Sequence, residues 1–401
     1  WLIGLMEGVE DIPGAALSEG IRWNWESFPE YLDHLDALPL ALDVGAQVPH
    51  GAVRGYVMGE RGARNEPATA EDIAAMAAIV EAGIRAGALG FSTSRTLAHR
   101  AIDGEPVPGT FAAEDELFGI GRVLGELGTG VFELAPAGVA GEDLSAPATE
   151  VAWMRKLAET IGRPVTFAML QVDSAPELWR DLLDESAAAL ATGAQLVPQV
   201  AGRPTGMLSG FDATYCFFDA IPAYQALAGR SAAEKASYFR TAEGRGALLA
   251  WEPDEAVAAQ IAHAAERTFL LGDPPDYEPG PEASLAAVAQ ANGRTVLEVA
   301  LDAMLANDGQ GLLYLPILNY SDGHSEPTRE MLLHPAAVLG LADGGAHVST
   351  ICDGSSPTWM LSHWVRDRTR GERLPLELVV KRQTSDTARL YGLGDRGVLA
   401  P

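Results

Sequence analysis

The sequence predicts an α/β fold, and within that class a parallel β/α barrel that carries an inserted subdomain. Four consecutive helix, glycine and strand units lie between Thr69 and about Val200, which favours right-handed parallel crossovers over hairpins. A buried strand within Ala336–His347 ends in an aspartate, Asp343, as barrel strands that carry chemistry do. An open doubly wound sheet has the same alternation, but no G-x-G-x-x-G loop follows any strand, which disfavours the dinucleotide-binding version.

Glycines and capping residues set the limits of these four units. Thr69 and Asp72 form a capping-box pattern at the first helix, and Gly87 ends it. Later helices end in the same way at Gly128, Gly162 and Gly193. The predicted helices are 69–87, 111–127, 149–161 and 174–192, and the predicted strands are 88–94, 130–136, 164–171 and 194–200.

The remaining segments are less regular. Residues 1–39 are mostly helical in pattern, and the stretch 40–48 is predicted as a strand that leads to His50. The stretch 203–292 is rich in Pro, Gly and acidic residues and predicts an insertion or lid. After that the pattern predicts a helix over 285–307 that is broken near Gly293, a buried strand in 311–320, a helix from Ser356 and a last helix over 376–391.

Composition excludes several classes of partner. The 401 residues include 55 acidic and 28 basic side chains, a net charge of −27, which argues against nucleic acid and anionic membranes. Hydrophobic residues make up 47%, enough for a large core. Two cysteines without a C-x-x-C motif favour a reducing cytoplasm, and no stretch has the length of a transmembrane helix. The chain starts at Trp1 and stops at Pro401, so we expect a piece of a longer protein.

Asp343 is the first candidate for a catalytic residue. An apolar run leads to it, and Gly344 and Gly345 follow at once, which is typical of a strand that delivers a carboxylate to a tight loop. The alternative is an aspartate that caps the loop or a following helix.

Several stretches resemble the amidohydrolase superfamily. The matching stretches are LMEGVEDIP, WNWESFPEYLDHLD, MGERGARNEPATAEDIAAM, ALGFSTSR, DGGAH and VVKRQTSDTARLYGLGDRGVLAP. Their order along nearly the whole chain is most similar to the branch of N-acyl-D-amino-acid deacylases, also called D-aminoacylases. The resemblance implies a metal-bearing (β/α)8 TIM-like barrel over residues 1–401, with a small β-sandwich made from both chain ends.

The same resemblance implies that the chain lacks parts of that architecture. Both ends of the sandwich are missing, and so is the first barrel strand with its His-x-His metal ligands, since no H-x-H occurs here. The cysteine ligand of the D-aminoacylases would precede Trp1. The expected cofactor is a divalent metal, most simply zinc, whose main ligands lie outside this fragment, so the barrel is incomplete at its N-terminus and the fragment alone need not be active.

The resemblance also assigns roles to two carboxylates. Asp343 matches the aspartate that contacts the metal and its bound water, where it acts as general acid and base. On the strands that usually carry metal-binding histidines, this chain has Glu133 and Gln171. Glu133 is a hard oxygen donor and a candidate metal ligand in place of an imidazole. Its alternative role is a buried, paired charge.

Five further residues are candidates for substrate binding. The loop after Asp343 has no arginine for a substrate carboxylate, so Arg95 and His99, or Arg203, are alternatives at strand ends. His347 follows Asp343 in the same loop, and His50 follows a predicted strand. Each of these residues taken alone also fits a surface, loop or salt-bridge role.

The leading hypothesis is a metal-dependent amidohydrolase that hydrolyses a non-peptide C–N bond, most simply in an N-acyl-(D-)amino acid. Asp343 would be its general acid and base, and a small-molecule amide its substrate. A second hypothesis is a metal-free hydrolase that uses Glu133 and Asp343 as a carboxylate pair. A third is a catalytically degenerate barrel used for binding. The exact substrate, its stereochemistry, the metal and the oligomeric state do not follow from the sequence.

Overall fold

The computed structural model describes residues 1–340, 342, 344, 347, 351 and 354–400. Contacts divide the chain into two compact units. The first contains Trp1–Gly202, Thr328–Ala342 and Ser356–Pro401, and the second contains Arg203–Pro327 and Asp343–Ser355. The insertion predicted at 203–292 therefore begins where the second unit begins, while its extent stays a prediction. None of the helices in the described ranges is long and apolar enough to span a membrane.

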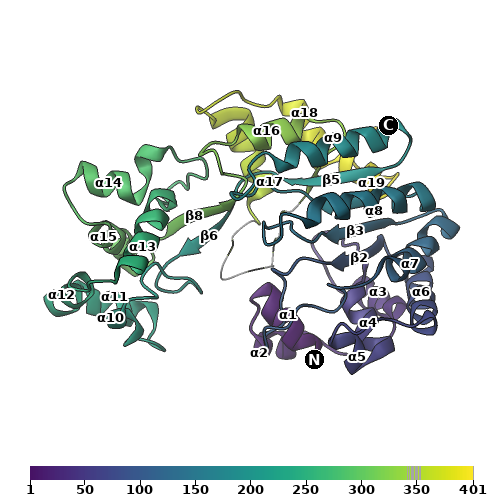
Figure 1. The fold of residues 1–401 in the computed structure, drawn as a ribbon, viewed down its shortest axis with the longest axis horizontal. Helices are drawn as coiled ribbons and strands as arrows, with labels where there is room; N and C mark the ends of the chain where they lie inside the picture. Colours follow the sequence, from purple (N-terminus) through teal and green to yellow (C-terminus); the bar gives the residue numbers. More distant parts are fainter. Residues whose placement is uncertain (341, 343, 345–346, 348–350, 352–353, 401) are drawn as a thin grey trace. The chain divides into compact units, whose positions relative to one another are not determined.

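The first unit is built on a six-stranded, wholly parallel sheet with the order β1-β2-β3-β4-β5-β9 (Figure 1). The strands are β1 (Val48–Pro49), β2 (Gly90–Ser94), β3 (Val131–Ala135), β4 (Val165–Ala168), β5 (Leu196–Ala201) and β9 (Val338–Gly340). The four strands predicted between 88 and 200 are confirmed as β2 to β5, and each pairs with the next one along the chain. The α/β class is thus confirmed.

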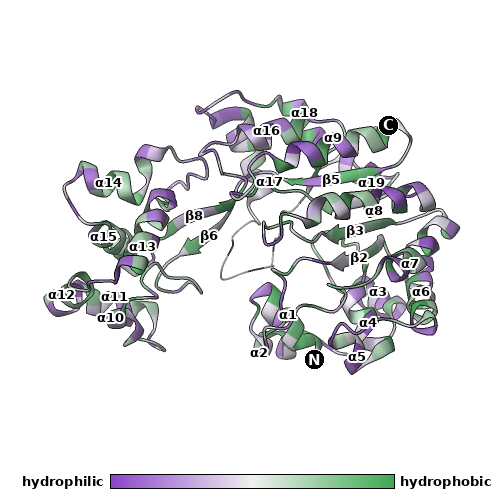
Figure 2. Cartoon of the chain, viewed as in Figure 1, coloured by the Kyte–Doolittle hydropathy of each residue, from purple (hydrophilic) through white to green (hydrophobic). Residues whose placement is uncertain are grey.

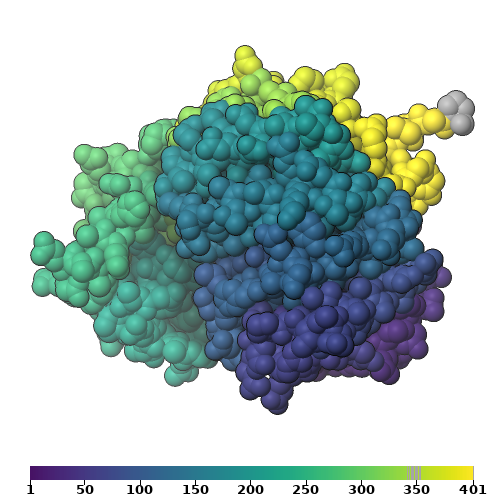
Figure 3. Space-filling view, turned by 45° about the vertical axis from the view of Figure 1, so that its right-hand side comes forward, coloured from purple at the N-terminus to yellow at the C-terminus, as the bar shows by residue number. Residues whose placement is uncertain are grey.

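Helices alternate with these strands. Those of the first unit are α1 (Leu2–Glu10), α2 (Gly14–Gly20), α3 (Phe28–Asp36), α4 (His50–Met58), α5 (Glu60–Ala63), α6 (Ala70–Arg85), α7 (Glu114–Leu127), α8 (Ala146–Ile161), α9 (Leu178–Ala191), α16 (Glu326–Leu333), α17 (Ser356–Trp359), a π-helix (Met360–Asp367), α18 (Leu376–Gln383) and α19 (Ser385–Leu390). In Figure 3 the blue and teal segments that contain α6 to α9 form a continuous outer face of this unit.

Local chemistry explains where these helices begin and end. The backbone N–H of Asp72 donates to Thr69 Oγ1 at 3.2 Å, and Thr69 N–H donates to Asp72 Oδ2 at 2.9 Å, so the predicted capping box is present. Helices α7 and α8 end at Gly128 and Gly162, whose φ values of 65° and 62° lie in the left-handed region that glycine adopts at little cost.

Alternation along the strands sorts side chains between the two faces of the sheet. Phe91 lies opposite Phe132 in the β2–β3 register, with ring centroids 5.2 Å apart, and Phe132 also contacts Trp153 of α8. This apolar face packs against the helices, and β3 and β5 are mainly in the hydrophobic colour in Figure 2. Because successive residues point to opposite faces, Glu133 and its neighbour across the ladder, Thr166, point to the other side.

The second unit contains a three-stranded antiparallel sheet with the order β6-β8-β7. Its strands are β6 (Thr205–Ser209), β7 (Phe269–Leu270) and β8 (Leu313–Leu318), and its helices are α10 (Pro222–Gln225), α11 (Ala232–Arg240), α12 (Ala242–Leu249), α13 (Glu255–Arg267), a 3-10 turn (Pro281–Ala283), α14 (Leu285–Ala291) and α15 (Val296–Gly309). Its core includes Phe211, Phe218, Phe239 and Met304, all almost completely buried.

Three sequence predictions differ from the structure in detail. The strand predicted in 311–320 exists as β8, but β6 and β7 flank it on both sides, so it belongs to the antiparallel sheet. Of the strand predicted over 40–48, only Val48 joins a ladder, because Leu42 and Val44 are exposed and have no neighbouring strand. The single helix predicted over 376–391 is divided into α18 and α19 at Thr384, whose φ and ψ of −126° and −85° are not helical.

Candidate functional site

The carboxyl ends of β2 and β3 carry the polar groups that define a candidate site in the first unit. Ser94 is the last residue of β2, and its Oγ lies 2.8 Å from Nδ1 of His99. The next residue, Arg95, donates its backbone N–H to Ala135 O at the end of β3, at 2.8 Å. Ligands of parallel α/β folds bind beyond the carboxyl ends of the strands, so we expect a ligand site at this edge of the sheet.

A cavity of about 850 Å³ opens at this edge. Ser94 and His99 lie in its wall, and most of the remaining lining comes from apolar side chains of the first three helices, the segment before α3, and α4. Among the described lining residues the ionisable side chains are Glu10, Glu26, Tyr31, His50, Tyr56 and His99, and none is Lys or Arg. The cavity therefore has a mainly apolar lining, with Ser94 and His99 beyond β2 among its polar groups.

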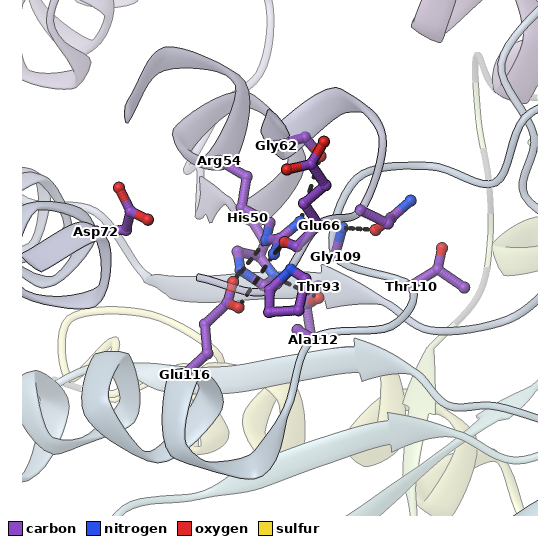
Figure 4. A network of polar contacts seen from close by, with 12 residues as sticks. His50, Arg54, Gly62, Glu66, Asp72, Thr93, Gly109, Thr110, Ala112 and Glu116 are labelled. Atoms are coloured by element: carbon purple, nitrogen blue, oxygen red, sulfur yellow. Dashed lines mark hydrogen bonds and ion pairs between the residues drawn. The ribbon is translucent and has the colours of Figure 1, made fainter. Parts of the chain in front are cut away.

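A buried polar network supports this wall (Figure 4). His50 and Arg54 on α4 both point toward Glu116 of α7, and the three side chains are 1%, 1% and 2% exposed. His50 Nε2 lies 2.8 Å from Glu116 Oε1, and Nδ1 lies 2.8 Å from Thr93 Oγ1. Arg54 Nε donates to Glu116 Oε1 at 2.7 Å.

Charge and burial fix the protonation of this network. Burial lowers the pKa of His50 below its usual value, and the hydrogen bond that His50 donates to Glu116 only partly opposes this effect. Burial alone would raise the pKa of Glu116, but hydrogen bonds from His50 and Arg54 outweigh it, and the net shift is downward. We therefore assign a neutral imidazole whose Nε2–H donates to an ionised Glu116, with the Thr93 hydroxyl donating to Nδ1.

The backbone around His50 is closely packed. Gly109 has a φ of 103°, and a Cβ atom placed there would lie 2.7 Å from His50 Nδ1. A glycine is therefore needed for both reasons, conformation and space. His50 does line the cavity, as a substrate-binding role requires, but its two ring nitrogens already contact Thr93 and Glu116.

Arg95 is held by an ion pair next to the site. Its Nε lies 2.9 Å and 3.1 Å from the two carboxylate oxygens of Glu150, and its Nη1 donates to Ala112 O at 2.7 Å. Trp153 Nε1 donates to the same carboxylate at 3.0 Å. The guanidinium is thus occupied by protein groups in this arrangement, and the anion-binding role predicted for Arg95 stays a prediction. His99, by contrast, faces the cavity.

Glu133 lies within β3, two residues before its end, on the face of the sheet opposite the phenylalanines. Its Oε2 accepts a hydrogen bond from Tyr391 Oη at 2.7 Å and another from Gln47 Nε2. Burial, followed by the negative charge of Glu133, raises the pKa of Tyr391, so the phenol stays protonated and donates. The carboxylate is thus hydrogen-bonded by two neutral groups. Both the metal-ligand role and the paired-charge alternative for Glu133 stay predictions.

The other predicted site residues lie in the second unit. Arg203 is 2% exposed, donates from Nη1 to Ser355 Oγ at 3.1 Å, and places its guanidinium carbon 3.8 Å from the ring centroid of Tyr277. His347 has a φ of 47°, and its carbonyl accepts from Ile351 N–H at 2.8 Å. Asp343 lies outside the described residues, so its predicted roles as catalytic residue and metal ligand stay predictions.

The residues that the structure describes do not provide a metal site. Within them, no three His, Cys, Asp or Glu side chains converge as a metal ion requires. Glu133 has hydrogen-bonding neighbours of other types, Gln47 and Tyr391, and Gln171 donates to Pro176 O at 3.2 Å. The zinc prediction therefore depends on the family resemblance alone.

Sequence reasoning did not find several residues of this site. Ser94 ends a correctly predicted strand, and its position was the only signal available. Glu116 sits beside Leu117 and Ile120 on the buried side of a helix, an unusual place for a carboxylate, and that is a signal of a buried partner. Arg54 and Tyr391 come from distant segments, and nothing in their local sequence marks them.

Comparison with known proteins places the chain in a family. The model of the amidohydrolase family matches residues 1–401, so the chain belongs to the amidohydrolase family. A D-aminoacylase from Alcaligenes xylosoxydans xylosoxydans is 39% identical over 77 residues, which cover 19% of this chain and 15% of that protein. An uncharacterized protein of Mycobacterium tuberculosis is 23% identical over 421 aligned residues, covering 97% of this chain and 65% of the relative.

Solved structures agree at the level of the fold. Two crystal structures of D-aminoacylase, one described as defining a novel subset of amidohydrolases and one concerning a binuclear metal centre, superpose with a TM-score of 0.52 at 20% identity. Each match covers 92% of this chain and 62% of the D-aminoacylase chain. The chain thus spans less than two thirds of the length of these relatives.

Proposed function

We propose that this chain is part of a hydrolase that cleaves a non-peptide C–N bond, most simply the amide bond of an N-acyl-(D-)amino acid. The observation that carries the proposal is the cavity at the carboxyl ends of β2 and β3, with Ser94 and His99 in its wall, in a member of the amidohydrolase family. Polar groups at the end of an apolar cavity suit a substrate that joins an apolar group to an amide. The similarity to D-aminoacylase supports the substrate class.

The architecture proposed for the complete protein is a (β/α)8 barrel. The six parallel strands of the first unit supply part of such a barrel, and β9 leads toward Asp343. A carboxylate at that strand end has a definite task in amide hydrolysis. Asp343 accepts a proton from the attacking water while the oxygen of that water bonds to the carbonyl carbon of the amide. Asp343 then gives the proton to the leaving nitrogen as the C–N bond breaks. The products are a carboxylic acid and a free amine.

A divalent metal, most simply zinc, remains part of the proposal for the complete protein, because the family resemblance implies it. Zinc would polarise the carbonyl and make water a stronger nucleophile. The residues that the structure describes do not form a site for it.

A second candidate function is binding without catalysis. The observation that favours it is the pairing of Glu133 with Tyr391 and Gln47, which gives this carboxylate a structural role. The metal-free hydrolase with a carboxylate pair requires a suitable distance between the carboxyl groups of Glu133 and Asp343. Asp343 lies outside the described residues, so this hypothesis stays a prediction.

The proposal is tested by incubating the protein with N-acyl derivatives of D- and L-amino acids, with and without added zinc, and measuring the release of free amine. Amine release that depends on the protein supports the hydrolase. A complete lack of release across the panel, with normal folding confirmed by circular dichroism, would leave the binding function as the better account.

A further inference from the structure

The cavity beside Ser94 is much larger than a small acyl group needs. Its volume of about 850 Å³ lies in the upper part of the range for sites that bury drug-sized ligands. An acetyl group contains two carbon atoms and would leave most of this space unfilled. The lining includes Met6, Ile21, Val48 and Ile79, which offer aliphatic contacts along its length.

The segment that follows Ser94 in the wall of the cavity is held in place by side-chain contacts. Thr96 Oγ1 donates to Glu142, and Arg95 is clamped by Glu150, so both residues that follow Ser94 are fixed. A serine hydroxyl has one donor and two acceptor positions, and the 2.8 Å contact with His99 uses one of them. Ser94 thus retains capacity to hydrogen-bond a ligand in the cavity.

The charges of the lining select the kind of head group. Among the described lining residues the carboxyl side chains are Glu10 and Glu26, and no Lys or Arg is present. A carboxylate bound beside Ser94 would lack a cationic partner among these lining residues, whereas a neutral amide needs only hydrogen bonds. At Ser94 the lining therefore favours the amide group of an N-acyl amino acid over its carboxylate.

We infer that this cavity binds the acyl group of an N-acyl substrate with a medium or long aliphatic chain, with the amide at Ser94 and His99. The inference rests on the proposed function, because it names the acyl part of the same substrate. On this inference Ser94 is a substrate-binding residue, and the cavity determines which acyl-chain lengths the protein prefers. Burial of one methylene group contributes about 0.8 kcal/mol, which corresponds to an affinity gain of about four-fold.

Calorimetric binding of a series of N-acylglycines tests the inference. Glycine is achiral, so the stereochemical preference does not interfere, and all ligands are kept below their micellar concentrations. The protein carries Asp343→Asn, which on the proposed function prevents turnover. We expect N-octanoylglycine to bind at least about 50-fold more tightly than N-acetylglycine, a conservative figure for six added methylene groups. Equal affinities across the series would overturn the inference.

Two matched variants locate the binding. Ala82 on α6 lines the cavity, and Ala75 on the same helix is exposed and does not. Ala82→Phe should weaken binding of the octanoyl ligand at least about five-fold and leave the acetyl ligand unchanged, because the ring takes the space of several methylene groups. Ala75→Phe should change neither. An equal loss of affinity for the octanoyl ligand in both variants would contradict this location, and so would no loss in either variant.

A third variant and a free acid test the amide end. Ser94→Ala should weaken every ligand by a similar factor, about three- to ten-fold, since it removes one hydrogen bond. Octanoic acid should bind more weakly than N-octanoylglycine, and equal binding would contradict the placement of the amide. Thermal melting confirms that each variant is folded.

The outcomes separate this inference from the proposed function. If binding depends on chain length but the unmutated protein releases no glycine, the acyl site is supported and the hydrolase proposal is contradicted. If the protein hydrolyses the ligands with no preference for chain length, the hydrolase proposal is supported and the acyl site is contradicted.

Discussion

His50 Nε2 lies 2.8 Å from Glu116 Oε1, and both side chains are almost completely buried. The same oxygen accepts from Arg54 Nε at 2.7 Å, so one carboxylate joins two residues of α4 to α7. Because His50 and Thr93 also line or adjoin the cavity, this network fixes the wall that supports the proposed site.

Replacement of Glu116 should be strongly destabilising. Glu116→Gln removes the charge that balances Arg54, whose side chain is 1% exposed, and leaves a buried cation without its partner. We expect a loss of about 3–5 kcal/mol in the free energy of unfolding, measured by urea denaturation. Glu114→Gln, at an exposed position of the same helix, is the control and should cost at most ~1 kcal/mol. Similar losses in the two variants would contradict this role.

The lowered pKa of His50 predicts that acid destabilises the protein. In the unfolded chain His50 takes up a proton as the pH falls below about 6.5, while the buried folded form resists it, so the unfolded state binds more protons. Stability from this residue is complete above pH 6.5 and is lost as the pH falls toward the folded pKa. Between pH 7.5 and 5.5 the loss from this one group is at most about 1.4 kcal/mol.

The comparison with His50→Gln isolates this contribution. Glutamine is able to bond both Thr93 and Glu116 but does not titrate. The difference in unfolding free energy between the protein and this variant should therefore shrink as the pH falls. A difference that stays constant with pH would show that His50 has no shifted pKa.

The ion pair of Arg95 and Glu150 should contribute much more than an exposed pair. The two side chains are 15% and 5% exposed, and Trp153 adds a hydrogen bond to the same carboxylate. A double-mutant cycle of Arg95→Ala and Glu150→Ala should give a coupling of about 1–3 kcal/mol. The exposed pair Arg155 and Glu159 on α8 is the control, with an expected coupling of about 0.3–0.5 kcal/mol. A coupling near zero for Arg95 and Glu150 would contradict a stabilising ion pair and would favour the predicted anion-binding role of Arg95.

Tyr391 should stabilise the protein through Glu133. Tyr391→Phe removes a hydrogen bond of 2.7 Å to a half-buried carboxylate, which should cost about 1.5–3 kcal/mol in unfolding free energy. Tyr56→Phe is the matched control, because its hydroxyl bonds the carboxylate of Glu26 at an exposed position and should cost well under ~1 kcal/mol. Equal effects would argue against a structural role for the Tyr391 contact.

The metal role of Glu133 is decided by a separate measurement. Elemental analysis of the protein and of Glu133→Gln, both purified without chelator, compares their metal contents. If Glu133 is a ligand, as the sequence predicts, the variant should hold less metal. Unchanged metal with lower stability would assign Glu133 to the structural contacts with Tyr391 and Gln47.

The regular part of the fold was predictable because its signals are local. The capping box at Thr69 and the glycines at 128 and 162 fix helix limits within a few residues, and β2 to β5 follow them directly. The pairing of β8 was not predictable, since its apolar run fits a parallel or an antiparallel sheet equally well. Which sheet it joins depends on β6, more than 100 residues earlier in the chain.

The candidate site was predictable only in part. The end of a predicted strand pointed to His99, because position along a strand is a local property. The family resemblance pointed to Glu133, which lies within β3. The partners of those residues come from distant segments: Tyr391 meets Glu133 across 258 residues, and Glu116 meets His50 across 66. No local pattern encodes such contacts.

The catalytic rate of Asp343→Asn on an N-acyl amino acid tests the central claim most directly. The claim is that the protein hydrolyses such amides with Asp343 as general acid and base. The amide side chain preserves size but does not transfer protons, so kcat should fall by about 10²- to 10⁴-fold while the melting temperature stays close to that of the unmutated protein. An unchanged kcat in the folded variant would contradict the claim.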